Sequence, residues 1–480
     1  MVDDDGSSDT PTVFPSIEEP KDDDWAYPKR AVILMDAFSP YHGGYLAQIA
    51  RDVYGVAIIN VWSDYIYQYF RQKEDESEIQ SMAIPKDLEG WKNHGDMASL
   101  RIEAVICESD SGLPEAEVLG EKLGLRKQNG FNEGRRDKYL MNEAARKAGL
   151  PTVEQKLCRS LEEALEFAKE LQQKVKKTNT PGVSQDQSVP NQPKTPMCVV
   201  KPIRGVASEN VFLCCSPEEV RKACDTIFGS VIFGSPREKH DTVLVQEFAT
   251  GKEYAIDVVS RDGEHKVAAL WRYDKRSANG ASFVYFATEL LDGHASAEAD
   301  AVCAYIQRAL DALGVKWGLT HNEVILTSQG PRLVEVNCRQ HNMDFAPITM
   351  ACIGYNALDM QLAAYLDPKG DREGELVWEL LPDRPVTRAL GAMVHLVNYQ
   401  SGRLVAPNVA ALQEIQEMSS VLDLEVYPSF LEAGEEISPT IDIRTDAGWV
   451  QLINDDEEAF RRDYDRIVEL MPTLFETKEP

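Results

Sequence analysis

The interpretation of the whole chain depends on one stretch, Trp317-Gly-Leu-Thr-His-Asn-Glu-Val-Ile-Leu-Thr-Ser-Gln-Gly-Pro-Arg-Leu-Val-Glu-Val-Asn-Cys-Arg339. Two runs of alternating apolar and polar residues, 319–326 and 332–339, flank the polar segment 327–331, which contains Gly and Pro. This pattern predicts a β-hairpin with a short loop.

The two-residue period of a strand sorts the side chains of this hairpin onto two faces. Antiparallel pairing around a turn near Gln329 places Glu323 opposite Glu335, and His321 opposite Asn337. The mostly apolar face is expected to hold Asn322, Val324, Leu326, Val334 and Val336. The other face is expected to hold His321, Glu323, Glu335, Asn337 and Arg339.

Glu323, Glu335 and the amide oxygen of Asn337 form a candidate metal site. Carboxylates that face each other directly are destabilising unless a cation or a proton lies between them. Hard oxygen donors of this kind suit Mg²⁺. The alternative is a solvated sheet face, on which charged residues are common.

Composition narrows the class of protein. The 480 residues leave room for several domains, and 43% hydrophobic with 27% charged residues is ordinary for a globular protein. A formal net charge of −29 argues against a nucleic-acid partner and against an anionic membrane surface. No apolar run approaches ~20 residues, so no membrane span is expected. No secretory signal is visible.

The nine cysteines show neither paired CxxC spacing nor the density of a disulfide scaffold. They are interpreted as reduced thiols, most of them small buried residues. The expected location is the cytoplasm.

Residues 1–30 are acidic and contain proline, which predicts a disordered tail. Short apolar runs at 31–35, 55–61 and 103–107 alternate with helical stretches, which predicts a parallel α/β domain over 31–125. A helix is expected to begin near Lys138, where Arg135 and Arg136 add two more cations. This basic group is explained equally well by a solvated helix start or by contacts with phosphates.

Ser160 and Glu163 have the capping-box spacing that predicts a helix running to about Lys176. Residues 177–196 contain four prolines and no periodic apolar pattern, which predicts a flexible insertion. A strand at 197–203 delivers Lys201 to its end, and the small-residue loop that follows can cover phosphates with backbone N–H groups and Ser208.

Further strands are expected at 241–249, 254–259 and 266–273, with helices at 297–313 and 353–366. From residue 386 onward, short strands alternate with loops, and an amphipathic helix near 457–471 closes the chain.

The ordered set of motifs over residues 31–370 resembles the ATP-grasp superfamily. The motifs of this set are Lys138 at a helix start, Lys201-Pro202, Val245-Gln-Glu-Phe before Gly251-Lys-Glu253, and Glu323 with Glu335-Val-Asn337-Cys-Arg339. Arg135-Arg-Asp-Lys-Tyr-Leu-Met141 and Thr320-His-Asn-Glu323 are most similar to the L-amino-acid ligase and carnosine-synthase branch of carboxylate–amine ligases.

This resemblance implies an α/β (α+β) protein with the ATP-grasp fold. The implied parts are a Rossmann-like domain at 31–125, an ATP-grasp domain at 126–370 with a mobile lid at about 151–245, and an α+β subdomain at 371–480. It implies ATP and Mg²⁺ (or Mn²⁺) as cofactors. Lys138 and Lys201 would hold phosphates, Glu247, Phe248 and Ala249 would meet adenine, and Glu253 would meet the ribose. Glu323, Glu335 and Asn337 would bind the metal.

The implied reaction turns a carboxylate, such as an amino acid, into an acyl phosphate and joins it to an amine. Lys201 and Arg339 would act in catalysis, with Arg339 stabilising the tetrahedral oxyanion. The expected partners are a small carboxylate and an amine, without nucleic acid or membrane, and the sequence leaves a homodimer open. A carboxylase-type subunit and a catalytically silent nucleotide-binding protein are the alternatives.

One segment departs from that branch, which commonly carries a Gly-Gly pair after the arginine. Here Gln340-His341-Asn342-Met343-Asp344 stands in its place, so the acyl substrate is left open. His341 is either a base or specificity contact, or an ordinary polar loop residue. Trp271 and Tyr273 either wall the substrate cleft or pack the sheet.

Overall fold

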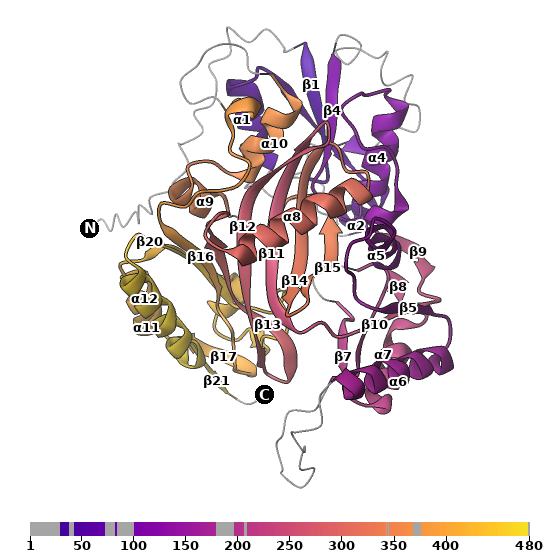
Figure 1. Cartoon of the computed structure of the whole chain (residues 1–480). Helices are drawn as coiled ribbons and strands as arrows, with labels where there is room; N and C mark the ends of the chain where they lie inside the picture. The colour runs from indigo at the N-terminus through magenta and orange to yellow at the C-terminus, as the bar shows by residue number, and fades with distance from the viewer. Residues whose placement is uncertain are drawn as a thin grey trace, which may run out of the picture.

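The structure is a computed structural model that describes residues 29–37, 43–72, 82–83, 100–178, 196–205, 209–341, 343, 345–367 and 376–478. The acidic tail up to residue 28, most of the 177–196 insertion, and Ser208 with Asn342 lie outside the described residues. Figure 1 shows a central sheet of long strands with three smaller units around it.

A parallel four-stranded sheet of order β3-β2-β1-β4 forms the N-terminal unit. Its elements are β1 (Arg30–Met35), α1 (Tyr45–Asp52), β2 (Ala57–Trp62), α2 (Asp64–Gln72), β3 (Met82–Ala83), β4 (Arg101–Cys107) and α4 (Leu113–Lys122). Residues 31–35 are fully buried, as expected for a parallel strand with helices on both faces. The predicted parallel α/β architecture is therefore confirmed.

The helix predicted to begin at Lys138 is α5 (Lys138–Lys147), and it leads into a second, antiparallel sheet of order β5-β10-β6-β7. We call these four strands the small sheet. Its elements are β5 (Gln155–Cys158), α6 (Leu161–Thr178), β6 (Cys198–Lys201), β7 (Phe212–Cys214), α7 (Pro217–Ile227) and β10 (Val243–Gln246), with the short pair β8 (Val231–Ile232) and β9 (Ser235–Lys239) inserted before β10. The N–H of Glu163 donates to Ser160 Oγ at 3.3 Å, so the predicted cap of α6 forms.

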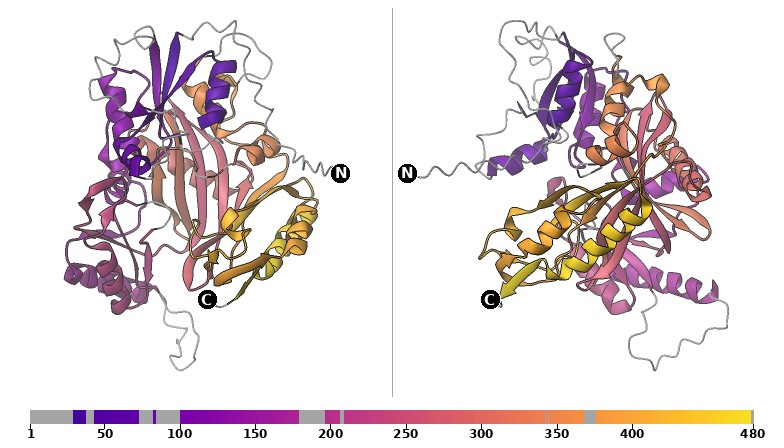
Figure 2. Two further views of the ribbon diagram at one scale, coloured as in Figure 1. Left: turned by 180° about the vertical axis from the view of Figure 1, so that it is seen from behind. Right: turned by 90° about the vertical axis from the view of Figure 1, so that its left-hand side faces the viewer.

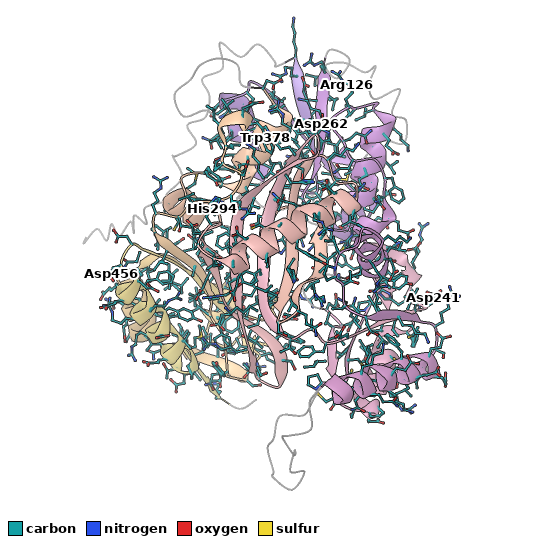
Figure 3. All side chains as sticks on the ribbon, in the orientation of Figure 1. Arg126, Asp241, Asp262, His294, Trp378 and Asp456 are labelled. Atoms are coloured by element: carbon teal, nitrogen blue, oxygen red, sulfur yellow. The ribbon has the colours of Figure 1, made fainter. Side chains whose placement is uncertain are left out.

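The central sheet has eight strands in the order β15-β14-β11-β12-β13-β16-β20-β18. These are β11 (Gly251–Arg261), β12 (Glu264–Ala278), β13 (Ala281–Leu291), β14 (Gly318–Thr327), β15 (Gly330–Asn337), β16 (Leu390–His395), β18 (Val421–Val426) and β20 (Gly448–Asn454). The predicted Asp262-Gly263 turn joins β11 to β12, with φ of 52° and 85°, and Asp262 is labelled at its tip in Figure 3.

Helix α8 (Ala297–Ala312) covers one face of this sheet, as Figure 1 shows. Its buried Val302, Ile306 and Leu310 share a core with Val324 and Val336 of the hairpin. The same face takes Ile256 and Val258 from β11, whereas Ala255 and Val259 enter a core on the opposite side of the sheet. Glu253 and Asp257, which are in phase with Ala255 and Val259 on β11, therefore project on the face away from α8.

The predicted hairpin at 318–337 is confirmed, including its register: His321 pairs with Asn337 and Glu323 with Glu335. The turn is tighter than predicted, because the strands extend to Thr327 and Gly330, whose φ is 98°.

One predicted side-chain orientation in this hairpin is wrong. The register shifts by one residue after Glu323, so Val324 pairs with Leu333 rather than with Val334. Leu333 therefore fills the core, and Val334 instead lines a cavity described below.

Two helices follow the hairpin: α9 (Ala346–Cys352), which was not predicted, and α10 (Ala357–Tyr365), which is the helix predicted at 353–366 and begins four residues later than predicted. Gly354, with φ of 89°, ends the first, and the Asn356 side chain caps the second by accepting the N–H of Asp359. Helix α10 packs on the sheet face opposite α8.

The C-terminal part contributes β16, β20 and β18 to the central sheet. It also forms a separate three-stranded sheet of order β19-β17-β21. Its remaining elements are β17 (Gly402–Pro407), α11 (Val409–Gln416), β19 (Glu436–Ile437), α12 (Glu457–Leu470) and β21 (Phe475–Lys478). Figure 2 shows this part projecting to one side of the central sheet. Because the central sheet continues past residue 371, the proposed domain boundaries stay predictions.

Among the helices in the described ranges, none is long and apolar enough to cross a membrane.

Candidate active site

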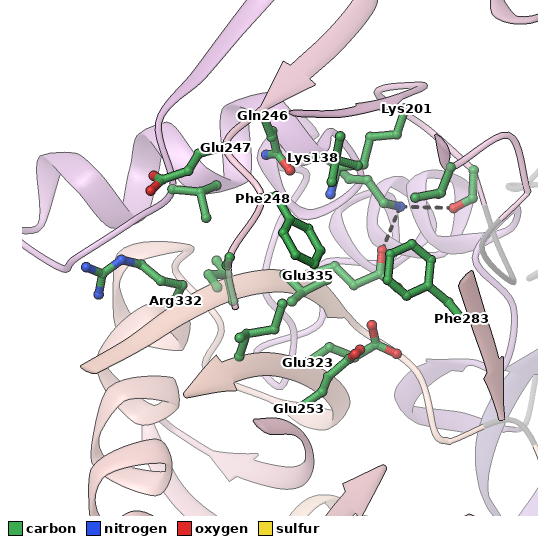
Figure 4. A pocket seen from close by; sticks show the side chains of 18 of the residues that line it. Lys138, Lys201, Gln246, Glu247, Phe248, Glu253, Phe283, Glu323, Arg332 and Glu335 are labelled. Carbon is green, nitrogen blue, oxygen red and sulfur yellow. Dashed lines mark hydrogen bonds and ion pairs between the residues drawn. The ribbon is translucent and has the colours of Figure 1, made fainter. Parts of the chain in front are cut away.

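A cavity lies between the small sheet and the face of the central sheet opposite α8 (Figure 4). The small sheet and the segment after it contribute Val199, Lys201, Pro202, Gln246, Glu247, Phe248 and Ala249. The central sheet contributes Glu253, Lys275, Phe283, Glu323, Ile325, Arg332, Leu333, Val334 and Glu335, and α5 contributes Lys138. We call this space the first cavity.

Three carboxylates from three neighbouring strands meet at one end of this cavity. Glu323 of β14 lies opposite Glu335 of β15, and on its other side Glu323 is paired with Ala255, two residues from Glu253 on β11. Each of the three side chains is less than a fifth exposed. The period of two therefore brings the predicted metal carboxylates onto one face, with Glu253 beside them (Figure 4).

Lys138 reaches the same carboxylates from the start of α5. Its Nζ lies 2.6 Å from Glu335 Oε2 and donates to the carbonyl oxygen of Gly205 at 3.1 Å (Figure 4). The Asp137 side chain caps α5 by accepting the N–H groups of Tyr139 and Leu140, which fixes the position of the first helical residue. Lys138 therefore extends from the start of α5 into the first cavity.

Lys201 lies at the end of β6 and is almost fully buried. Burial, followed by the positive charge of Lys138, lowers the pKa of Lys201 to about 8. Two ammonium groups held together beside buried carboxylates are suited to bind an anion with several negative charges.

Two of the three carboxylates, Glu335 and Glu323, are kept ionised by their neighbours. Burial alone would raise the pKa of Glu335, but the Lys138 charge and hydrogen bonds from Asn337 and Lys138 lower it overall. For Glu323, burial is likewise outweighed, first by the hydrogen bond with His321. For Glu253, burial dominates and raises the pKa.

Asn337 and Arg339 lie next to the cavity without lining it. The Asn337 amide donates to Glu335 Oε1 at 3.0 Å. Arg339 Nε and Nη2 each lie 2.7 Å from Asp110 Oδ2, and Nη1 donates to the Gln340 carbonyl at 2.7 Å. Asp110 also accepts from Arg136 at 2.7 Å, so this buried cluster ties the end of β15 to the N-terminal unit.

The predicted adenine segment passes along the opposite end of the first cavity. Phe248 and Phe283 project into the space in Figure 4. Glu247 is fixed to the start of the small sheet, because its N–H donates to the Glu154 carbonyl at 2.8 Å and its Oε2 accepts the Glu154 N–H at 3.1 Å. The rings of Phe248 and Phe283, together with the ammonium groups of Lys138 and Lys201, offer contacts for a flat base joined to phosphates.

Comparison with known proteins agrees with this geometry. Residues 194–346 match the ATP-grasp domain family. The chain contains an ATP-grasp domain. Its fold is the ATP-grasp fold: the solved L-amino acid ligase of Bacillus licheniformis superposes over 93% of this chain and 98% of its own, with a TM-score of 0.64 and 16% identity.

Two curated enzymes are related in sequence to this chain. Dapdiamide A synthase of Enterobacter agglomerans is 25% identical over 350 residues, which is 71% of this chain and 74% of that enzyme. Carnosine synthase 1 of Gallus gallus is 30% identical over 196 residues, which is 40% of this chain and 20% of that enzyme. Both relatives are synthases by name, and the similarity leaves the substrates of this chain undefined.

Lys275 lines the first cavity, and the sequence analysis did not identify it as a candidate site residue. Its Nζ lies 2.6 Å from Glu253 Oε1 and over the rings of Tyr273 and Tyr285, at 4.6 and 4.3 Å. The signal was present, because Trp271, Tyr273 and Lys275 alternate along β12 and so share the face of the site. Burial would lower the pKa of Lys275, but Glu253 raises it well above its ordinary value, so the charge is permanent.

A second missed feature lies two residues along the strands from the carboxylates. We call Asp257, His321 and His341 the His–Asp cluster. Asp257 Oδ1 lies 3.0 Å from His321 Nδ1, and Asp257 Oδ2 lies 3.5 Å from His341 Nδ1 and accepts from Trp271 Nε1 at 2.7 Å. The imidazole rings of the two histidines stack with centroids 3.9 Å apart.

The ligand atoms of this cluster lie within 4.8 Å of one another, which is close enough for a metal ion. However, the Asp257 carboxylate already accepts two good hydrogen bonds, so we interpret the cluster as a positioning network. It is linked to Glu323, one of the predicted metal carboxylates, since Tyr273 OH donates to Glu323 Oε1 at 3.3 Å and lies 3.4 Å from a nitrogen of each histidine.

Proposed function

We propose that this protein is an ATP-dependent carboxylate–amine ligase that forms an amide or a dipeptide. The observation that supports the proposal most strongly is the convergence of Glu323, Glu335, Lys138 and Lys201 on one cavity. Kinship with dapdiamide A synthase and carnosine synthase 1 favours amide formation.

In the proposed complex, adenine lies against the segment Glu247, Phe248 and Ala249, and Glu253 contacts the ribose. Lys138 and Lys201 hold phosphate oxygens, and Ser208 belongs to the same phosphate-covering loop. Glu323, Glu335 and Asn337 hold Mg²⁺, which when bound neutralises the phosphates and polarises the terminal one. The donor set fits such an ion, because buried carboxylates from adjacent strands otherwise require cations between them.

The proposed reaction proceeds in two displacements. A substrate carboxylate oxygen attacks the γ-phosphorus of ATP, and the bond from that phosphorus to the bridging oxygen breaks, giving an acyl phosphate and ADP. The nitrogen of an amine then attacks the acyl carbon, the bond to the phosphate oxygen breaks, and the nitrogen loses a proton. The products are an amide, ADP and inorganic phosphate.

Arg339 is proposed to stabilise the oxyanion of the second step. Burial opposes its charge, but Asp110, with smaller contributions from Glu335 and Glu323, raises its pKa, so it stays a cation beside the site. Its double contact with Asp110 fixes the guanidinium, and a preorganised cation is what an oxyanion requires.

The test is ADP release in the presence of ATP and Mg²⁺ while amino acids are supplied singly and in pairs, with mass spectrometry of the products. The proposal predicts release that depends on both an acid and an amine, and a product whose mass is their sum minus water. Bicarbonate replacing the acid would instead indicate a carboxylase-type subunit. Binding of ATP without any turnover would indicate a silent nucleotide-binding protein.

A further inference from the structure

The small sheet and its helices α6 and α7, which we call the small-sheet unit, carry a short hairpin between α7 and β10. It consists of β8 and β9, residues 231–239, and we call it the docking hairpin. Its base is fixed, because the N–H of His240 donates to the Ser230 carbonyl at 2.9 Å and the N–H of Gly229 donates to the His240 carbonyl at 2.8 Å. None of its described side chains lines the first cavity, so the docking hairpin has no direct contact with that space.

The tip of the docking hairpin lies against the N-terminal unit. The ring of Phe233 meets the ring of Tyr65 on α2, with centroids 5.5 Å apart and planes inclined by 59°. Gly234 follows with φ of 85°, and a Cβ atom at this position would lie 3.2 Å from the Cα and Cβ atoms of Ser111. The positive φ and this close approach both favour glycine. The small-sheet unit and the N-terminal unit thus meet at the hairpin tip, outside the first cavity.

The surface that receives the tip is held in place by hydrogen bonds. Asp36, at the end of β1, accepts the N–H and the hydroxyl of Ser63 at 2.7 and 2.9 Å, and it also accepts the hydroxyl of Ser109. Ser109 Oγ in turn accepts the N–H of Gly112 at 2.8 Å and lies 3.2 Å from Ser111 Oγ. Ser111 therefore belongs to a loop with a defined position.

The same loop holds the arginine to which we assign the oxyanion. Asp110, directly before Ser111, accepts from Arg339 and from Arg136, each at 2.7 Å. Asp110 and Ser111 are both buried. The docking hairpin thus presses on the residue next to the partner of Arg339.

We propose that the docking hairpin is a latch that holds the small-sheet unit closed over the first cavity while an acyl phosphate is present. This inference rests on the proposed ligase function. Water that reached the acyl phosphate would attack it and break the bond between the acyl group and the phosphate, returning the acid and inorganic phosphate without an amide. An intact latch excludes that water and keeps the loop beside Arg339 in place, so its loss lowers amide formation more than ADP release.

Two variants remove the latch in different ways. The first replaces residues 231–239 by Asn-Gly. Its base stays intact, because the hydrogen bond from the His240 N–H to the Ser230 carbonyl is the one that closes a two-residue hairpin turn. The second is Phe233→Ala, which removes the ring contact with Tyr65. The matched control is Val231→Ala, because Val231 lies on the same hairpin with 57% of its surface exposed.

The measurement is the amount of amide formed per ADP released, with ATP, Mg²⁺ and the pair of amino acids that gives most product in the wild type. The wild type and Val231→Ala are expected to form about one amide per ADP. Both latch variants are expected to form at least ~3-fold less amide per ADP. This ratio separates a latch from a structural role, since a partly unfolded enzyme loses both products in proportion.

A disulfide tests the contact without any substrate. In the double variant Ser111→Cys with Gly234→Cys, the two Cβ atoms start 3.2 Å apart, so a shift of a few tenths of an ångström brings them to the separation of about 3.5–4.5 Å found in disulfides. Oxidation with diamide, which takes up the two electrons and two protons, is expected to link them, and peptide mass spectrometry identifies the pair. Ser111→Cys with Val231→Cys is the control and is expected to remain unlinked.

The linked protein also shows whether the hairpin controls access to the first cavity. It is expected to bind the fluorescent analogue trinitrophenyl-ATP at least ~10-fold more slowly than the same protein reduced with dithiothreitol, because the small-sheet unit cannot open. An equal rate before and after reduction would contradict the latch.

The remaining outcomes separate the two proposals. A wild-type ratio of amide to ADP in the variant that lacks residues 231–239 would overturn the latch and leave the ligase intact. Failure of the Ser111→Cys, Gly234→Cys variant to form the disulfide, although it melts cooperatively, would do the same. If the wild type released no ADP with any acid and amine, the ligase function would be overturned, and the disulfide with trinitrophenyl-ATP would still decide whether the hairpin closes the cavity.

Discussion

Lys138 Nζ and Glu335 Oε2 lie 2.6 Å apart across the junction between α5 and β15. This ion pair joins a lysine assigned to phosphate with a glutamate assigned to the metal. In the proposed complex the pair separates, because the lysine turns to a phosphate oxygen while the carboxylate binds the ion. The phosphate then compensates the charge of Lys138, and the metal ion compensates the charge of Glu335. Nucleotide and metal are therefore expected to bind cooperatively.

Replacement of the metal carboxylate tests this assignment. Glu335→Ala is expected to lower ADP release at least ~1000-fold, because a metal-binding charge is lost at the transferred phosphate. The fold is expected to persist, since Glu335 lies in the cavity wall rather than in a core. The measurement is steady-state ADP release together with thermal unfolding. Glu298→Ala is the matched control, because Glu298 forms an exposed ion pair with Lys252 at 2.8 Å and should leave turnover unchanged. Normal turnover in Glu335→Ala would remove the carboxylate from the mechanism.

Lys275 is expected to balance the charge of the site before ligand binds. Lys275→Met leaves Glu253 and Glu323 facing each other without their ammonium partner, so the melting temperature without ligand is expected to fall by several degrees. Mg²⁺ should restore more of this loss in the variant than it adds to the wild type, because it supplies the missing positive charge. Differential scanning calorimetry with and without Mg²⁺ measures both effects. Lys252→Met, which breaks the exposed pair, should change little; equal shifts in the two variants would contradict the role of Lys275.

Glu108, at the end of β4, is expected to make stability depend on pH. Its side chain is buried, and burial raises its pKa to about 8, partly opposed by a hydrogen bond with the Gln340 side chain. Because the folded-state pKa lies above the unfolded one, the free energy of unfolding falls as pH rises from about 4.5 to about 8. Glu108→Gln is expected to remove that fall and to add at least ~1 kcal/mol at pH 8.

Urea unfolding at pH 5 and pH 8 measures this effect. Glu103 on the same strand is the control, because its ion pairs with Arg30 and Arg101 outweigh burial and lower its pKa. Glu103→Gln should therefore destabilise at pH 8, the opposite sign to Glu108→Gln. A loss of stability in Glu108→Gln at pH 8 would show that contacts of the ionised carboxylate outweigh the cost of its burial.

The insertion at 177–196 is predicted to contribute little to stability. Its sequence has no periodic apolar pattern that could pack against the rest of the protein. Replacement of these residues by a short Gly-Ser linker is expected to shift the melting temperature by no more than about 2 °C. Calorimetry measures this shift. A drop in melting temperature of about 5 °C or more would mean that the segment packs against the rest of the protein.

The sequence predicted the candidate site best where its residues lie on a single pair of adjacent strands. The period of two and a turn near Gln329 predicted Glu323 opposite Glu335, and the pair forms because the bulge after Glu323 offsets the difference between the predicted and the observed turn. The bulge that moves Val334 into the first cavity was not predictable, because a one-residue slip leaves no mark in an alternating sequence.

Contacts between segments that are far apart in the chain could not be predicted from the sequence either. The pairing of Arg339 with Asp110 joins residues 229 positions apart, and neither residue type identifies its partner. Lys275 was missed for a different reason: its strand was predicted only to Tyr273, so the alternation that places it in the site was cut short.

A crystal structure with Mn²⁺ and a non-hydrolysable ATP analogue tests the central claim most directly, because manganese is located by its anomalous scattering. The account predicts a peak within about 2.5 Å of carboxylate oxygens of both Glu323 and Glu335, with the terminal phosphates within hydrogen-bonding distance of Lys138 and Lys201. A nucleotide bound with no metal between those two carboxylates, or with its phosphates remote from both lysines, would contradict it.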